Sequence, residues 1–456
     1  MSHTPTPTEN KMGVMPVGKL LISMSVPMMI SMLVQALYNI VDSIFVAQIS
    51  ENALSAVSLA FPLQTLMIAV AGGTGVGVNA LVSRALGAKD QDTADRVANT
   101  GILLALCSYL AFALLGVVMV GPFFRFQTDV AEIVTYGIDY GRICMCASLG
   151  IFVQITMERL LQSTGRAKLS MVTQLSGAIL NIILDPILIF GFFGLPAMGV
   201  AGAALATVIG QWVAALLAIF LNQKFNKALE LHRHHILPDS YVIRMIMNVG
   251  IPSIIMVGIG SVMNFGVNKI LQGFSETATG VFSIYFKLQS FFFKPLFGIN
   301  NAVISIVAFN YGARKPDRMM KTVKMASAAG LTIMLVGLAA FQLVPELLLV
   351  IFDPSPEFMH MGVEALRTIS WCFPVAAVCI ILGSTFQALG AGIYSTLVSL
   401  GRQLVILLPA AYLLSLSGVG TRVWWAWPIA ESMGLTMTVF FFLRNYRQRI
   451  KPLYEG

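Results

Sequence analysis

Two carboxylates lie inside strongly apolar stretches of the chain. Asp42 follows Gln35 by seven residues and Asn39 by three, which places the three side chains on one face of a helix. Asp185 follows Asn181 by one helical turn. An ionisable group costs roughly 2.5–3.5 kcal/mol in the centre of a bilayer on insertion scales, and two neighbouring carboxylates in low dielectric cannot both be ionised cheaply. These residues therefore predict a site that takes up a proton or a sodium ion.

The second half of the chain carries different charges. Lys294, Arg402 and Glu431 all fall near the middle of apolar stretches. An internal ion pair of Glu431 with Arg402 or with Lys294 is one interpretation. A cationic wall that faces a substrate is the other, and the sequence leaves both open.

The elements that position these groups are membrane-spanning helices. Hydrophobic residues make up 57% of the 456 residues and charged residues only 11%, which excludes an ordinary soluble protein. Apolar runs long enough to cross a bilayer recur throughout the chain. We predict twelve spans, near 19–46, 53–80, 97–121, 131–157, 168–191, 196–221, 243–268, 279–308, 322–346, 360–385, 391–416 and 423–443.

The second half of the chain repeats the first at a distance of 225 residues (252 − 27). The repeated pairs include Pro27 and Pro252, Gln64 and Gln289, and Gly87 and Gly312. Each repeat holds six spans, so both enter the membrane in the same orientation. The predicted fold is all-α: a polytopic membrane protein of twelve transmembrane helices in two six-helix lobes related by a parallel internal repeat. The predicted segments are a flexible cytoplasmic tail (1–16), an N-lobe (17–221), a cytoplasmic inter-lobe loop (222–242), a C-lobe (243–446) and a cytoplasmic tail (447–456).

The repeat retains polar amides but not carboxylates. Asn39 corresponds to Asn264 and Gln64 to Gln289, whereas Asp42 corresponds to a valine. The alternative is structural: Asp42 would cap a helix, and the second carboxylate would form a hydrogen bond within the fold. The asymmetry favours ion coupling, placed in the N-lobe. The polar residues expected to line a substrate cavity are Gln35, Asn39, Gln64, Asn264 and Gln289.

The polar side chains of the N-lobe are predicted to lie at similar depths in the membrane, so they can come into contact. At 1.5 Å per residue, Asp185 lies roughly 25 Å above the inner end of the fifth span. Thr207 lies roughly 16 Å below the outer end of the sixth span.

Pro27 removes a backbone hydrogen bond in the first span, and the resulting kink is either static or a hinge.

Charge distribution sets the orientation. Most of the 29 lysines and arginines fall in loops on one side of the predicted spans, which places both termini in the cytoplasm. The net charge of +8 is thus explained by topology, and no nucleic-acid partner is expected. The five cysteines lack the spacing of a metal or redox motif, so we expect no metal and no cofactor.

Several stretches resemble the multidrug and toxic compound extrusion (MATE) family. They are VDSIFVAQISENALSAVSLAFPL (41–63), GVGVNALVSRALGAKD (75–90), LQSTGRAKLSMV (161–172) and NIILDPILIFG (181–191). The resemblance implies export by antiport against protons or sodium. It is closer to the DinF-like and MepA-like branch, whose cation site lies in the N-lobe, than to the NorM-like branch. The family motif implies a coupling set of Asp42, Tyr140, Asn181, Asp185 and Thr207, with Pro27 as the residue whose bending accompanies protonation.

The predicted function is secondary active efflux of amphipathic drugs or metabolites by alternating access. Protons are favoured over sodium because the site is small and built from carboxylates. A lipid-linked saccharide flippase of the same broad superfamily is the alternative. A membrane enzyme is not expected, since no HExxH, GxSxG or phosphate-cradling motif occurs. We expect a monomer in the lipid bilayer of a prokaryotic plasma (inner) membrane.

Overall fold

The computed structural model describes residues 10–231, 238–273, 275–352, 355–417 and 420–455. No β-strand occurs among these residues. The first half of the chain forms α1 (Lys11–Val14), α2 (Val17–Ala47), α3 (Glu51–Gly87), α4 (Gln91–Val118), α5 (Val120–Gln127), α6 (Ala131–Cys146), α7 (Leu149–Ser163), α8 (Ala167–Phe190), η1 (Phe192–Gly194) and α9 (Gly199–Phe225).

The second half forms the other lobe. Its elements are α10 (Ser240–Gln272), α11 (Glu276–Gly312), α12 (Pro316–Leu343), α13 (Pro345–Val350), α14 (Pro356–Ser370), α15 (Phe373–Ala388), α16 (Gly392–Leu400), η3 (Gly401–Leu407), α17 (Leu408–Ser415), η4 (Gly420–Trp425), α18 (Ala426–Asn445), η5 (Tyr446–Ile450) and α19 (Pro452–Glu455). The inter-lobe connection is thus shorter than predicted, running from 226 to 239, and its histidine-rich part lies outside the described residues. The predicted C-terminal tail is helical as far as Glu455.

In the described part of the chain, ten helices are long and apolar enough to cross a membrane, and two bent pairs, each counted as one span, bring the number to twelve. The prediction of twelve transmembrane helices is confirmed. The pair α6 and α7 bends by 45°, and the pair α14 and α15 bends by 46°. The fourth span therefore continues to Ser163 instead of ending near residue 157, because a bent pair needs more residues to cross the same thickness.

The repeat is preserved in the helix boundaries. α3 and α11 begin and end 225 residues apart (276 − 51 and 312 − 87), and so do α4 and α12. The N-caps repeat as well: the Ser50 hydroxyl accepts from the Ala53 N–H at 3.0 Å, and the Ser275 hydroxyl accepts from the Ala278 N–H at 3.2 Å. The same local signals thus begin equivalent helices in both lobes.

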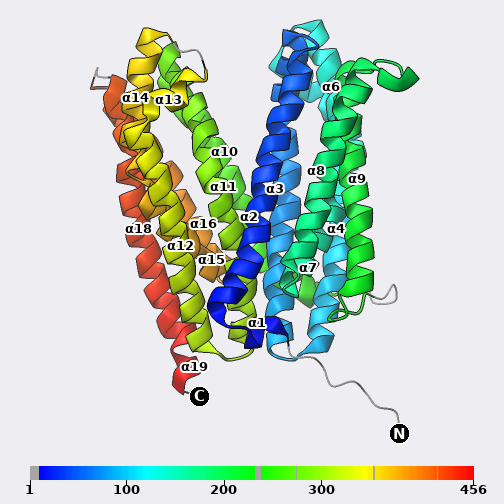
Figure 1. The fold of residues 1–456 in the computed structure, drawn as a ribbon, viewed down its shortest axis with the longest axis vertical. Helices are drawn as coiled ribbons and strands as arrows, with labels where there is room; N and C mark the ends of the chain where they lie inside the picture. The colour runs from blue at the N-terminus through cyan, green and yellow to red at the C-terminus, as the bar shows by residue number, and fades with distance from the viewer. Residues whose placement is uncertain (1–9, 232–237, 274, 353–354, 418–419, 456) are drawn as a thin grey trace.

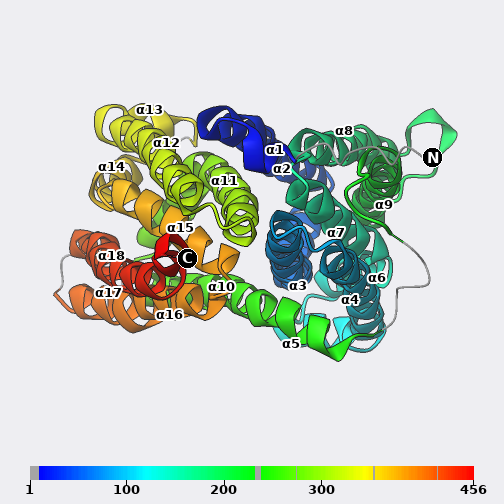
Figure 2. The same cartoon turned by 90° about the horizontal axis from the view of Figure 1, so that it is seen from below.

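The two lobes lie side by side (Figure 1). Their ribbons diverge toward one end and converge at the other, where α1 and the C-terminus lie, and the view from below shows α2 and α3 facing α11 and α10 (Figures 1 and 2). Two long helices of each lobe therefore form the contact between the lobes.

The converging end is closed by two glycines of the repeat. A Cβ atom on Gly87 would collide with the backbone carbonyl oxygen of Phe309, and a Cβ atom on Gly312 would collide with that of Arg84. Phe309 is the repeat equivalent of Arg84 (309 − 84 = 225). The ends of α3 and α11 therefore cross in a reciprocal contact that requires glycine on both sides.

A second reciprocal contact lies further along the same helices. A Cβ atom on Gly73 of α3 would collide with the backbone nitrogen of Ile254 on α10. A Cβ atom on Gly298 of α11 would collide with the backbone nitrogen of Met29 on α2. Small residues let helix backbones approach closely where lipid supplies no hydrophobic driving force between helices.

The segment 10–16, predicted as part of a flexible tail, is ordered. It forms α1, whose Met12 is fully buried. Arg318 Nη2 of α12 donates to the carbonyl oxygens of Met12 (3.0 Å) and Met15 (2.7 Å). Lys315 Nζ donates to the Gly13 carbonyl oxygen at 2.9 Å. The prediction was wrong for these residues because cations of the C-lobe bind their backbone, which a composition argument does not reveal.

α1 also contacts the N-lobe. The Lys11 side chain lies against Gly165. Burial, followed by the positive charges of Lys168 and Arg166, lowers the pKa of the Lys11 ammonium group. α1 therefore bridges the two lobes at their converging end.

Arg318→Ala is expected to release α1. The substitution leaves two carbonyl oxygens without their charged donor, and a hydrogen bond to a charged group contributes about 1.5–3 kcal/mol. Amide hydrogen exchange of residues 11–15 should accelerate by about tenfold or more. Lys324→Ala, an exposed position on the same helix, is the matched control. Equal exchange rates in the two variants would contradict the role of Arg318.

Candidate functional site

A pocket of about 140 Å³ lies inside the N-lobe, between α2, α3, α6, α7, α8 and α9. It contains the polar side chains that the sequence placed in this lobe, apart from one carboxylate buried behind them. The predicted residues that line it are Gln35, Asn39, Asp42, Gln64, Tyr140, Asn181 and Thr207. Residues from helices far apart in the sequence thus share one cavity.

Asp42 and Asp185 lie close together in the interior of the N-lobe. Asp185 is fully buried and Asp42 is 9% exposed, and their carboxyl groups are within hydrogen-bonding reach of each other. Asn181 Nδ2 donates to Asp185 Oδ1 at 3.4 Å and to Thr207 Oγ1 at 3.3 Å. α2, α8 and α9 therefore each supply part of one polar cluster.

This cluster has more acceptors than donors. Among the described residues, Asp42 Oδ1, Asp185 Oδ2 and Asn181 Oδ1 are buried and have no hydrogen-bond partner. A buried acceptor without a donor costs about 1–3 kcal/mol. A proton, or a hard cation that prefers oxygen ligands, would satisfy these atoms.

A second layer of polar groups surrounds the carboxylates. Gln64 Nε2 donates to the Tyr140 hydroxyl at 2.9 Å. Tyr38, Gln154 and Gln174 also line the pocket, although the sequence analysis did not select them. Tyr38 lies four residues before Asp42, so helical spacing from the carboxylate was the signal that could have identified it.

Pro27 lies inside α2, which continues from Val17 to Ala47 without interruption. Asp42 is on the same helix, nearer its other end. The role of Pro27 as a hinge stays a prediction.

Two adjacent charged residues that the sequence analysis missed, Glu158 and Arg159, lie on α7 of the N-lobe. Glu158 is buried and accepts from Thr173 Oγ1 at 2.9 Å and from Gln154 Nε2 at 3.0 Å. Its neighbour Arg159 donates from Nη1 to Asn301 Oδ1 of the C-lobe at 3.0 Å. These residues follow the predicted end of the fourth span by one and two positions, so an early boundary concealed two intramembrane charges.

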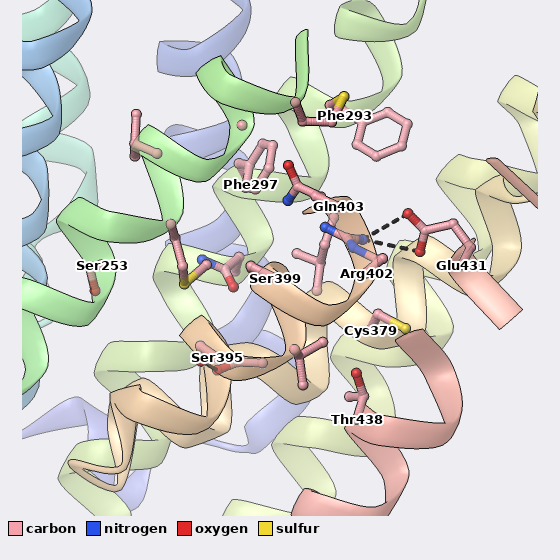
Figure 3. Close-up of a pocket in the computed structure, with 18 of the residues that line it drawn as sticks. Ser253, Phe293, Phe297, Cys379, Ser395, Ser399, Arg402, Gln403, Glu431 and Thr438 are labelled. Atoms are coloured by element: carbon pink, nitrogen blue, oxygen red, sulfur yellow. Dashed lines mark hydrogen bonds and ion pairs between the residues drawn. The ribbon is translucent and has the colours of Figure 1, made fainter. Parts of the chain in front are cut away.

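A larger cavity of about 510 Å³ lies mainly in the C-lobe and reaches α3 and α7 of the N-lobe. Figure 3 shows Arg402 and Glu431 in this cavity. Arg402 Nη1 donates to Glu431 Oε1 at 2.8 Å and to Oε2 at 3.0 Å. Lys294 has no ion pair with Glu431 among the described residues. Of the two pairings that the sequence left open, the structure forms the one with Arg402.

The two polar residues predicted for a C-lobe cavity have different positions. Gln289 lines the large cavity and accepts from the Tyr285 hydroxyl at 2.8 Å. Asn264 lines neither this cavity nor the N-lobe pocket. Its Oδ1 is buried without a hydrogen-bond partner in the described part of the chain.

The C-lobe has no counterpart of the carboxylate cluster. Val267, the repeat equivalent of Asp42, is fully buried in the apolar core. Ile406 and Ala410, the equivalents of Asn181 and Asp185, pack against the same core. The two lobes therefore share a scaffold but not the chemistry of this site.

Two six-helix lobes with internal polar cavities, joined along a closely packed interface, define a membrane transporter. The profile of the MatE family matches residues 27–187 and again residues 252–413. The matches begin at Pro27 and Pro252, which are 225 residues apart (252 − 27). The chain belongs to the MatE family of transporters, which are not enzymes.

Relatives match along nearly the whole chain. Multidrug export protein MepA of Staphylococcus haemolyticus is 27% identical over 430 residues, covering 94% of each chain. Probable multidrug resistance protein YoeA of Bacillus subtilis is 24% identical over 433 residues, covering 91% of each. A solved outward-facing structure of a multidrug resistance MATE family transporter of the MOP superfamily superposes with a TM-score of 0.91 and 26% identity, covering 99% of this chain and 100% of that one.

Proposed function

We propose that this protein is a secondary active exporter of amphipathic drugs or metabolites, driven by cation entry at the N-lobe carboxylates. The observation that carries the proposal is the cluster of Asp42, Asn181 and Asp185. It combines two buried carboxylates with three acceptor oxygens that lack donors. Protonation of one carboxylate would supply a donor and remove a buried charge in a single step.

Protons are the proposed coupling ion. The cluster contains two carboxylates and one amide, and a proton shared between carboxylates needs no further ligands. Sodium would draw on a larger set of oxygens, for which the Thr207 and Tyr140 hydroxyls are the available candidates in the same pocket.

Transport would proceed by alternating access between the lobes. We place both termini in the cytoplasm of a prokaryotic cell, because most loop lysines and arginines lie on that side. In this proposed orientation, the crossing at Gly87 and Gly312 would close the inner side, and the diverging ends of the lobes would face outward. Cation binding can drive the return of the transporter to the inward-facing conformation only if it favours that conformation over the outward-facing one.

Family membership favours export over the lipid-linked saccharide flippase. MepA and YoeA are named for multidrug export and resistance, and we extend that activity to this chain. The aromatic and methionine side chains of the large cavity, such as Phe293, Trp427 and Met256, suit apolar ligands of varied shape. We propose a monomer, since each chain contains both lobes.

Transport in proteoliposomes tests this proposal. Purified protein is reconstituted with a fluorescent amphipathic cation or a fluorescent amphipathic anion, and proton and sodium gradients are imposed separately. We expect a proton gradient to drive export of at least one dye and a sodium gradient alone to have no effect. Export driven only by sodium would overturn the choice of ion. Absence of gradient-driven movement for both dyes would overturn drug export.

A further inference from the structure

The ion pair in the C-lobe cavity occupies an unusual backbone setting. Arg402 lies on η3, a π-helical segment of seven residues, Gly401–Leu407, and such segments occur frequently at functional sites. Across from it, a Cβ atom on Gly434 of α18 would lie 2.8 Å from Arg402 Cδ. The absence of a side chain at Gly434 therefore leaves room for the aliphatic part of Arg402 beside Glu431.

The pair has spare donors. Both oxygens of Glu431 accept from Nη1 of Arg402. A guanidinium group has five N–H donors, and those on Nε and Nη2 have no hydrogen bond among the described residues. Nε is buried without a partner. Because Nε is closed off from the cavity, Nη2 is the donor group of Arg402 that remains for a ligand in the cavity.

Apart from Glu431, the described residues around Arg402 provide no acceptor of opposite charge on the cavity lining. Arg159 reaches the same cavity from the N-lobe and adds a second positive charge. Glu431 is the acidic residue on the lining, and it is already paired. Among the described residues that line it, the cavity therefore carries a net positive charge and has no unpaired anionic group.

The walls next to the pair are aromatic. Trp427 lies one helical turn before Glu431 on α18, and its ring is 6.4 Å from that of Tyr285. Phe293 and Phe297 of α11 face the same space, as Figure 3 shows. A flat aromatic body can pack on these rings while its charged end reaches Arg402.

We propose that the C-lobe cavity binds an amphipathic aromatic anion, whose carboxylate or sulfonate accepts hydrogen bonds from Arg402. This inference rests on the proposed function only in treating the ligand as cargo, since binding itself needs no gradient. A lipophilic cation fits less well. It would have to draw Glu431 away from Arg402, which would leave a buried guanidinium unpaired.

A matched pair of fluorescent probes tests the charge of the ligand. Dansylglycine and dansylcadaverine share an aromatic body and carry a carboxylate and an ammonium group, respectively. Their binding is measured by fluorescence titration of the full chain in lipid nanodiscs without a gradient. We expect wild-type protein to bind dansylglycine about tenfold or more tighter than dansylcadaverine, as a charge-assisted hydrogen bond requires.

Two variants give opposite predictions. Glu431→Gln frees Arg402 from its counter-charge, so dansylglycine should bind more tightly, a gain that misfolding would not produce. The double variant Arg402→Gln/Glu431→Gln leaves no lone buried charge and should lose about tenfold in affinity for dansylglycine. Dansylcadaverine affinity should stay unchanged in the double variant. Equal binding of the two probes, or unchanged dansylglycine binding in the double variant, would overturn the proposal.

The test is separable from that of the coupling mechanism. Asp42→Asn is expected to retain dansylglycine binding, because its site lies in the other pocket. Loss of coupled transport with retained dansylglycine binding would bear only on the coupling site in the N-lobe. Loss of the preference for dansylglycine with intact coupled transport would overturn only the proposal for the C-lobe cavity.

Discussion

Asp42→Asn and Asp185→Asn are each expected to reduce gradient-driven export by about tenfold or more, within the usual range of 5- to 150-fold for coupling between two sites. Each substitution removes one of the two buried carboxylates that lie within hydrogen-bonding reach of each other. The remaining carboxylate no longer has a neighbour that disfavours its ionised form. The binding of a cation would then no longer stabilise one conformation of the lobes more than the other. The measurement is dye efflux from proteoliposomes under an imposed proton gradient.

Asp129→Asn serves as the matched control for these variants. Asp129 is exposed in the connection between α5 and α6, so the same chemical change there should leave export at the wild-type rate. Exchange of labelled for unlabelled substrate without a gradient shows whether the variants are folded and bind cargo. Export by both pocket variants at the rate of Asp129→Asn would make these carboxylates structural.

Gly312→Ala is expected to open the converging end of the lobes. The new Cβ atom would collide with the carbonyl oxygen of Arg84, and a backbone atom cannot move aside as a flexible side chain can. Overpacking of this kind costs about 1–3 kcal/mol. A conformational equilibrium would shift by about tenfold for each 1.4 kcal/mol. The population of the closed arrangement should therefore fall by about tenfold relative to the open one.

Pulsed EPR between spin labels on Asp92 and Asp317 measures this change. Both residues are exposed and lie near the same end of the molecule, one on each lobe. Gly312→Ala should lengthen the mean distance. Gly258→Ala is the control, because a Cβ atom there meets no heavy atom within 4 Å and the change should slightly favour the helix. The same distance distribution in both variants would show that the crossing does not hold the end closed.

The internal repeat made the architecture predictable from sequence. Gly87 and Gly312, selected only because they recur, prove to be the residues at which α3 and α11 cross. Helix bends were harder to predict. α6 and α7 meet at Ala147 and Ser148, where no proline marks a break, so hydropathy indicated one continuous span.

The N-lobe pocket was predictable because its residues are polar within apolar helices. Asp42, Asp185 and Thr207 could be placed at similar depth from helical rise alone. The partner of Arg402 could not be chosen in this way, because Lys294 and Arg402 were estimated at the same depth and only helix packing separates them. Glu158 and Arg159 were missed because a hydropathy boundary fell just before them.

The glycine contacts between the lobes are self-complementary. Gly87 meets Phe309 while Gly312 meets Arg84, and Gly73 meets Ile254 while Gly298 meets Met29. Contacts of this form join two identical subunits about a two-fold axis. The two lobes thus pack against each other as the subunits of a symmetric dimer do, although they belong to one chain. Because the lobes are two parts of one sequence, this contact can stay symmetric while their interiors differ, with Asp42 and Asp185 in the N-lobe and Arg402 in the C-lobe.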